Sequence, residues 1–131
     1  MTAKKFKNPS DVHAPFSSYS HCVEVTNPST FLFCSGQIPA TQDGRILAQD
    51  SFSAQGELVI KNLKATLSNS GAQLTDIVRL VTYLSRKEDV TELRELLNRH
   101  FPVNPPANSV SIVQSLTHQD ILIELEATAV L

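Results

Sequence analysis

Three residues that follow a buried apolar run are the first candidates for binding chemistry. Residues 31–34 (FLFC) predict a buried strand, and Ser35, Gly36 and Gln37 come directly after it. A glycine at such a point lets a ligand or another backbone approach closely. Pro39 has no amide hydrogen for further pairing, so the strand should end there. A core strand followed by a loop explains the apolar half, and the three residues after it are candidates for ligand contact.

Two carboxylates, Glu124 and Glu126, form the second candidate group. Every odd position from 121 to 131 is apolar, whereas both glutamates share the even face with mainly apolar residues. Because burying an unpaired charge is costly, these carboxylates require an explanation. A strand edge or subunit rim would be a structural one, and a carboxylate that lines a pocket would be a functional one.

The two cysteines and four histidines show no spacing typical of metal ligands, so we predict no metal.

Residues 19–25 alternate as a strand would, and a turn over 26–30 would pair them with the apolar run. Cys22 would then lie opposite Cys34. A disulfide or redox pair is one interpretation; two buried thiols in a reducing cytosol is the favoured one.

Length and charge exclude several classes of protein. A chain of 131 residues can bury one core without disulfides, so we expect a single domain over residues 1–131. A net charge of −2 provides no excess of positive charge for nucleic acid. The apolar runs are too short for a membrane span and the start lacks a secretory signal, so we expect a cytoplasmic protein without membrane contact.

Residues 1–18 are polar and contain three clustered lysines, so we expect an irregular N-terminal segment or surface arm. A short strand is expected over 44–48. Asp50, Ser51 and Ser53 are possible N-caps of a following helix, which Gly71 would close. Gly56 within this helix predicts close packing against a neighbour, since glycine weakens a helix interior.

The second half predicts strand, helix and two further strands. Residues 77–84 are apolar on both faces, as in a strand that is covered on both sides. Asp89 and Glu92 have the spacing of a capping box at the start of a second helix, which Pro102 would end. A strand is expected over 109–114, before the alternating segment 121–131. Crossover connections would place both helices on one face of the sheet and leave the other face in need of a cover.

These elements, in this order, resemble the RidA/YjgF/UK114 family of reactive-intermediate imine and enamine deaminases, over residues 19–130. The resemblance is carried by short matching segments spread along the chain: residues 19–20, 35–39, 62–65, 76–78, 82–84, 106–107 with Ser109, and 123–127. It implies an α+β, chorismate-mutase-like (YjgF-like) mixed sheet with two helices packed on one face. It further implies a homotrimer with three clefts between subunits, which would cover the open sheet face.

The resemblance also implies a chemistry. Family members typically hydrolyse reactive imine or enamine acids to 2-keto acids and ammonia, without a cofactor. Carried over, Tyr19 would line the cleft, Ser35 and Gly36 would offer backbone donors, and Glu124 would position the attacking water. A small-molecule metabolite in the cleft between subunits would be the partner.

Three positions depart from the family pattern. Asn108 stands where deaminating members carry an arginine that pairs with the substrate carboxylate, so a charged fork is replaced by a neutral amide. Val110 stands where cysteine is common, and Arg94 where asparagine is common. Arg94 is either a displaced carboxylate clamp or a helix-surface arginine, and the latter is favoured. We therefore expect an altered substrate.

Two other functions are compatible with this resemblance. One is a non-catalytic trimer that binds a small molecule or a protein partner in the same cleft. The other is an endoribonuclease or translation inhibitor, as some family members are described; the near-neutral charge counts against RNA.

Overall fold

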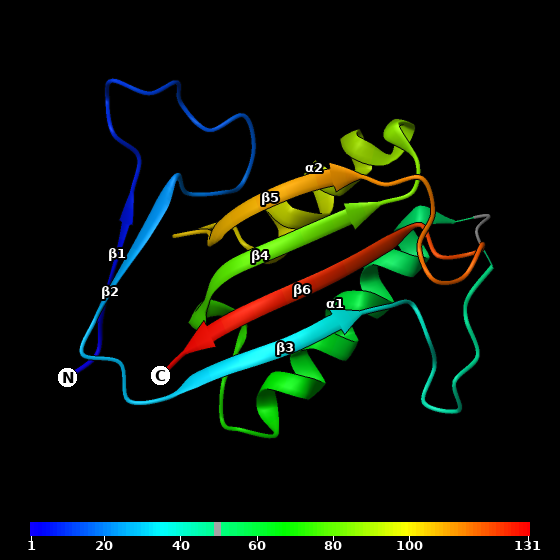
Figure 1. The fold of residues 1–131 in the computed structure, drawn as a ribbon, viewed down its shortest axis with the longest axis horizontal. Coiled ribbons are helices and arrows are strands. Elements are labelled where there is room, and N and C mark those ends of the chain that lie inside the picture. Colours follow the sequence, from blue (N-terminus) through cyan, green and yellow to red (C-terminus); the bar gives the residue numbers. More distant parts are fainter. Residues whose placement is uncertain (49–50) are drawn as a thin grey trace.

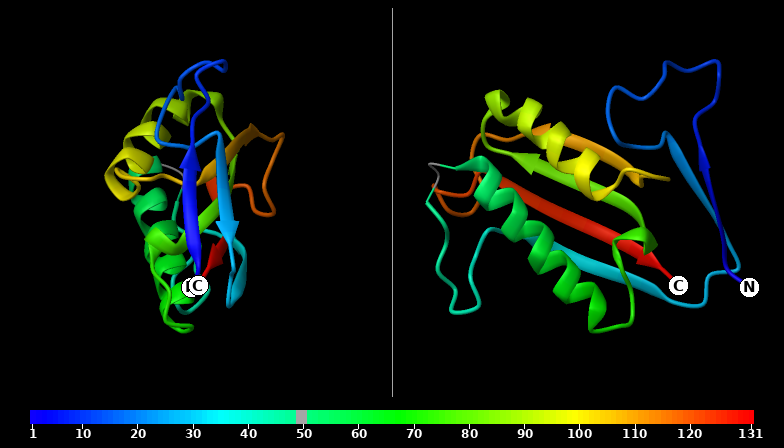
Figure 2. Two further views of the ribbon diagram at one scale, coloured as in Figure 1. Left: turned by 90° about the vertical axis from the view of Figure 1, so that its left-hand side faces the viewer. Right: turned by 180° about the vertical axis from the view of Figure 1, so that it is seen from behind.

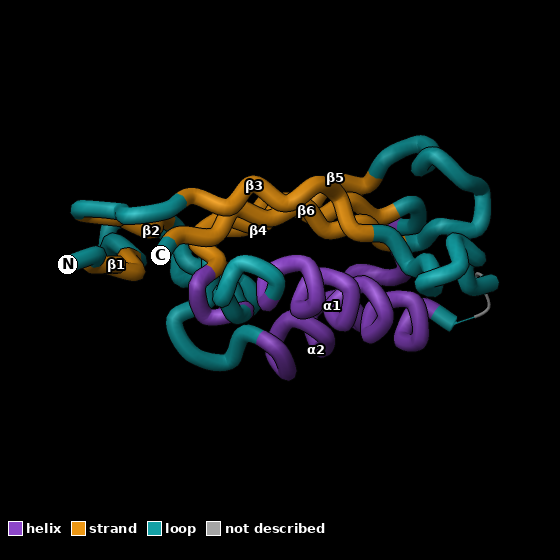
Figure 3. The backbone as a smooth tube through the Cα atoms, turned by 90° about the horizontal axis from the view of Figure 1, so that it is seen from below, coloured by secondary structure: helices purple, strands orange, loops and turns teal. Residues whose placement is uncertain are grey.

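The computed structural model of the chain describes residues 1–48 and 51–131. Its main body is a four-stranded mixed sheet with the order β3-β6-β4-β5, and both helices cover one face of it (Figure 1, Figure 3). A separate two-stranded sheet is formed by β1 and β2. The elements in chain order are β1 Ala3–Lys7, β2 Cys22–Thr26, β3 Phe31–Gln37, α1 Phe52–Ser68, η1 Leu74–Asp76, β4 Ile77–Leu84, η2 Lys87–Asp89, α2 Val90–His100, β5 Ala107–Ile112 and β6 Ile123–Val130.

The centre of the sheet is the antiparallel pair of β4 and β6, which have the two strongest sequence patterns. β4 has the predicted bounds, and on β6 the predicted apolar positions Ile123, Leu125, Ala127 and Ala129 are all buried. Their side chains form one core with the apolar sides of α1 and α2. β5 pairs parallel to β4 and starts two residues before the predicted 109. The opposite face of this sheet carries no helix of the described chain (Figure 3).

Helix α1 begins at one of its predicted caps and packs as its glycine predicted. The hydroxyl of Ser51 accepts a hydrogen bond from the Ala54 amide at 3.1 Å. Asp50, another candidate cap, lies outside the described residues. A Cβ atom at Gly56 would lie 2.9 Å from Leu96 Cδ2, so glycine is what lets α1 approach α2 here. The chain leaves the helix through Gly71, whose φ is +76°.

The predicted capping box of the second helix is wrong. Asp89 has helical backbone angles (φ −84°, ψ −3°), and its side chain caps no amide. Its carboxylate instead accepts two hydrogen bonds from the Arg86 guanidinium, at 2.8 and 2.9 Å. The two charged N–H groups of the guanidinium bind this buried carboxylate more strongly than a single backbone amide would.

The N-terminal segment is more regular than we expected. Within residues 1–18, Ala3–Lys7 forms β1 and pairs antiparallel with β2, which starts at Cys22 and not at Tyr19. Glu24 on β2 forms ion pairs with Lys5 and Lys7. Lys5 and Lys7 are therefore partners of a strand that lies a long loop away, and Lys4 pairs with Asp76 at 3.3 Å, which local polarity could not reveal. In Figure 2 this hairpin lies at the end of the main sheet where the C-terminus also lies.

The predicted hairpin of β2 with β3 is also wrong. β3 pairs with β6, because the Ser29 and Thr30 amides donate to the Leu131 carbonyl at 2.7 and 3.1 Å and direct β3 alongside the C-terminal strand. Cys22 is therefore exposed in one sheet and Cys34 buried in another, and both are free thiols. Only an isolated bridge, between Ala40 and Ile46, occupies the place of the expected strand over 44–48.

Candidate functional site

The predicted site residues fall into two groups on opposite faces of the main sheet. Asn108 pairs in register with Leu80, whose side chain is buried beneath the helices, so Asn108 lies on the helix side. Glu124 alternates with the buried Leu125 and therefore lies on the open side. Because a sheet separates the two groups, they cannot contact one ligand within a single chain.

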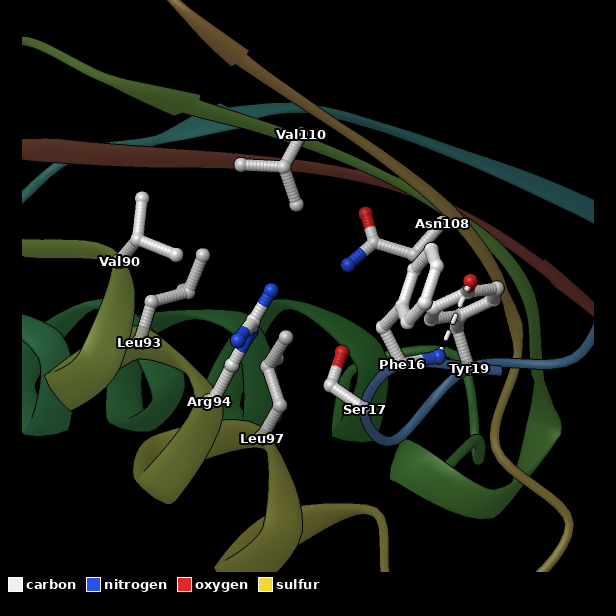
Figure 4. A pocket seen from close by; sticks show the side chains of 9 residues that line it. All are labelled: Phe16, Ser17, Tyr19, Val90, Leu93, Arg94, Leu97, Asn108 and Val110. Carbon is white, nitrogen blue, oxygen red and sulfur yellow. Dashed lines mark hydrogen bonds between the residues drawn. The ribbon is translucent and has the colours of Figure 1, made fainter. Parts of the chain in front are cut away.

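The first group lines a cavity of about 240 Å3 between α2, β5 and the segment before β2, which we call the α2–β5 pocket. Its lining contains four of the seven predicted residues, Tyr19, Arg94, Asn108 and Val110, and five that were not predicted: Phe16, Ser17, Val90, Leu93 and Leu97 (Figure 4). Val90, Leu93 and Leu97 lie on the side of α2 that faces the core. Their position at a cavity was not visible in the sequence, because an apolar stripe on a helix does not show which part of it borders a pocket.

Hydrogen bonds to backbone carbonyls fix Tyr19 at the pocket. The neighbouring Ser20 donates from its amide to Pro106 O at 3.1 Å and from its hydroxyl to Pro105 O at 2.6 Å. The Ser18 hydroxyl donates to the Phe101 carbonyl. Both anchors lie on the loop between α2 and β5. The segment is thus attached to the same loop that leads into Asn108, which keeps the Tyr19 ring at the pocket wall.

The polar groups that face the α2–β5 pocket are mainly hydrogen-bond donors. The Asn108 Oδ1 accepts from the buried Thr82 hydroxyl at 3.0 Å, and this bond leaves the side-chain NH2 group directed into the pocket (Figure 4). The Arg94 guanidinium also points inward (Figure 4), and it has no hydrogen bond or ion pair with any described residue. The Tyr19 oxygen accepts from the Phe16 amide at 3.2 Å, which leaves its hydroxyl hydrogen free to donate.

The second group surrounds a carboxylate on the open face. Glu124 lies beside Gly36, where an added Cβ atom would be 2.6 Å from the Glu124 Cδ. Burial, and secondarily the negative charge of Glu126, raises the pKa of the Glu124 carboxyl above its ordinary value of 4.5. Its side chain forms no hydrogen bond or ion pair with the described part of the chain. Ser35 is exposed at the same strand end, and its carbonyl accepts from Gln37 Nε2 at 3.0 Å.

The open face also carries exposed aromatic rings. Phe31 and Phe33 on β3 are 54% and 80% exposed, and their rings stack with centroids 6.1 Å apart. Adjacent exposed rings of this kind are candidates for a contact with another molecule.

Comparison with known proteins agrees with this architecture. The model of the family described as Endoribonuclease L-PSP matches residues 10–131. A RutC family protein of Pyrococcus abyssi is 34% identical over 115 residues, which are 88% of this chain and 87% of that protein. The chain belongs to the RidA/YjgF/UK114 (endoribonuclease L-PSP) family. A crystal structure of the Rid family protein YyfB from Yersinia pestis superimposes with a TM-score of 0.87 at 32% identity, and the match covers 98% of each chain.

These matches confirm the family resemblance and the α+β fold that the sequence predicted. The chloroplastic Reactive Intermediate Deaminase A of Arabidopsis thaliana is a more distant relative, 28% identical over 90% of this chain and 61% of that protein. Within this family fold, the chain presents a donor-lined pocket on one sheet face and an unpaired carboxylate on the other.

Two further observations concern membrane spans and metal ligands. Neither helix has the length and apolar sequence that a membrane span requires. Residues 1–48 and 51–131 contain no group of three or more histidine, cysteine or acidic side chains placed to hold a metal ion.

Proposed function

We propose that the protein hydrolyses a reactive imine or enamine to a carbonyl compound and ammonia, in clefts shared between the subunits of a homotrimer. The observation that carries this proposal is the partly buried Glu124 carboxylate beside Gly36, which has no partner among the described residues and has a raised pKa. Such a group can act as a general base toward a water molecule. The name of the Arabidopsis relative supports the same class of reaction.

The reaction requires little beyond the orientation of water. Glu124 accepts a proton as the water oxygen bonds to the imine carbon, and the proton then passes to the nitrogen. The product of this addition is a carbinolamine, whose hydroxyl proton passes to the amino nitrogen as the C–N bond breaks, so that ammonia leaves and the oxygen becomes the carbonyl. An enamine enters the same route once its carbon gains a proton and its nitrogen loses one, which gives the imine. Because an imine carbon is already electrophilic, a held substrate and a positioned water supply most of the catalysis.

The trimer brings the two half-sites together. The open sheet face, with Phe31 and Phe33 exposed, needs a partner, and a second copy of the chain provides one. The Glu124 group of one subunit would then face the α2–β5 pocket of a neighbour. The free thiols of Cys22 and Cys34 fit a cytoplasmic location.

A binding protein without catalysis is the second candidate, since Asn108 replaces the charged fork of deaminating members. RNA cleavage is disfavoured, because the chain has a net charge of −2 and Arg94 is the one charged side chain among the nine described residues of the pocket.

Light scattering on a size-exclusion column and an assay of imine loss, with imine generated by an amino-acid oxidase, test the proposal. Glu124→Gln should retain the trimer and lower turnover by about a hundredfold or more. A monomer, or unchanged turnover in an assembled Glu124→Gln variant, would contradict it.

A further inference from the structure

Two donors in the α2–β5 pocket point at a shared space, and neither donates a hydrogen bond to a described residue. The Asn108 NH2 group is directed there because its oxygen is engaged by Thr82 at 3.0 Å. The Arg94 guanidinium enters from α2 and has no partner among residues 1–48 and 51–131 (Figure 4). Neither donor can satisfy the other, and Arg94 is exposed, so an acceptor that enters from solvent could meet both donors; the positive charge of Arg94 favours an anion.

The position of Arg94 is set by its neighbours on the helix. Leu93 and Leu97 are each 1% exposed and hold this part of α2 against the core. Arg94 therefore has a fixed backbone, and its long side chain extends along the pocket wall into the space under β5 (Figure 4). An arginine on a fixed helix can act as a fork for a planar, two-oxygen anion.

The lining limits the charge and polarity of the ligand. Arg94 is the one charged member of the nine described lining residues, and five of the nine are apolar. A single positive charge balances one carboxylate, whereas a phosphate dianion or a dicarboxylate would keep an unbalanced charge against apolar walls. Phe16 is 72% exposed at this pocket and would gain contact with a hydrocarbon group of the ligand.

We propose that Arg94, together with Asn108, binds the carboxylate of a small apolar monocarboxylic acid, so that Arg94 is the specificity-determining residue of this site. That the acid is a 2-imino acid rests on the proposed function. The carboxylate lies between the guanidinium and the Asn108 amide, and the hydrocarbon group contacts Phe16 and Val110. Arg94 thereby supplies, from the helix, the charge that β5 lacks at Asn108.

The test measures binding to the assembled full chain by calorimetry, independently of turnover. The probe is 4-methyl-2-oxopentanoate, and the neutral control is 4-methyl-2-pentanone, in which a methyl group replaces the carboxylate. The acid should bind at least tenfold more tightly than the ketone, and Arg94→Met should remove this difference. Arg94→Lys should retain part of it, since it keeps the charge and loses the fork. Arg45→Met, which removes an exposed arginine in the loop between β3 and α1, should bind as the unaltered chain does.

Equal binding of acid and ketone, or an unchanged preference in Arg94→Met, would overturn the proposal. Should Arg94→Met fail to assemble, the Arg94→Lys variant decides, because loss of the guanidinium fork alone must weaken the acid and not the ketone. Failure of the proposed function gives a different result: Arg94-dependent binding of the acid without any acceleration of imine loss. Imine hydrolysis with an unaltered KM in Arg94→Lys and Arg94→Met would instead show that Arg94 does not bind the substrate, while the proposed enzymatic function would stand.

Discussion

Gly36 and Glu124 are in direct contact at the open face of the sheet, and the space beside Glu124 exists because residue 36 has no side chain. A Cβ atom at position 36 would lie 2.6 Å from Glu124 Cδ and 2.9 Å from its Cγ, closer than real Cβ atoms approach. The two residues come from neighbouring strands, β3 and β6, whose register shifts between Cys34 and Gln37. This irregularity brings Gly36 against the carboxylate.

Gly36→Ala should therefore displace the Glu124 carboxylate. Because the clash is with a flexible side chain on a partly exposed face, the fold should tolerate it, and Tm should change by only a few degrees. Turnover should fall by up to about a hundredfold, since a displacement of about 1 Å can have that effect on a positioned catalytic group. The measurement is kcat/KM together with Tm. Gly44→Ala is a control at a glycine with nothing within 4 Å of its added Cβ, although its φ of +84° makes it the less stable variant. Full activity in Gly36→Ala would show that the position of Glu124 does not matter.

Glu126→Gln should shift the acidic limb of the pH–rate profile to lower pH. The charge of Glu126 contributes to the raised pKa of Glu124, so its removal lowers that pKa and keeps Glu124 ionised in more acidic solution. The profile of kcat/KM reports the pKa of the free enzyme and is the appropriate measurement. An acidic limb that stays in place, in a variant that assembles normally, would mean that another group controls it.

The same raised pKa predicts the sign of a stability effect. A carboxyl with a folded-state pKa above its unfolded value binds protons more tightly when folded, so the fold loses stability as pH rises from about 4.5 through the raised pKa. Glu124→Gln removes this loss. Urea unfolding should show the variant to be more stable than the unaltered chain at pH 7, with a smaller difference at pH 4. A larger gain at pH 4 than at pH 7 would reverse the assigned direction.

Phe33→Glu should weaken assembly. The Phe33 ring is 80% exposed on the open face, and burying a charge there in a subunit contact without a partner is costly. Light scattering should show smaller species at micromolar concentrations, while circular dichroism keeps its shape. Ala65→Glu adds the same charge at an exposed position on α1, on the other side of the molecule, and should not alter assembly. An intact trimer of Phe33→Glu would exclude this face from the contact.

Asn108→Arg should increase capture of a 2-imino acid by up to about thirtyfold, because a charge-assisted bond is worth about 1.5 to 3 kcal/mol against about 1 for a neutral one. The structure adds a cost. Thr82 is fully buried and donates to Asn108, so the substitution leaves its hydroxyl unpaired and lowers stability by about 1 to 3 kcal/mol. Thr82→Val in the same chain should restore most of that stability. Urea unfolding of the single and double variants, together with imine kinetics, checks both effects.

Several parts of the fold were predictable because their signal is local. The alternation in β6 and the continuous apolar run of β4 each reflect burial within one element. Gly56 predicted a close approach of the helix to a neighbour, and Leu96 proved to be that neighbour. In the same way, Glu124 was recognisable as an unusual charge on an apolar strand face.

The remaining features depend on contacts between distant segments, which no local pattern specifies. The pairing of β3 with β6, and not with β2, separates Cys22 from Cys34. The lysines at the N-terminus form a strand only because Glu24 and the rest of β2 lie opposite them. The Asp89 carboxylate bonds to Arg86 and not to the first amides of α2, the helix that follows Asp89.

The sequence by itself determined the family, the core strands and the identity of the polar residues that differ from the family pattern, because these depend on residue type and order. Only the tertiary structure decided where those residues lie. The twofold alternation of a strand places Asn108 on the helix side and Glu124 on the open side, so the two cannot meet within one chain. The packing of α2 under β5 brings Arg94 into the same pocket as Asn108, a relationship that 13 residues of intervening sequence do not show.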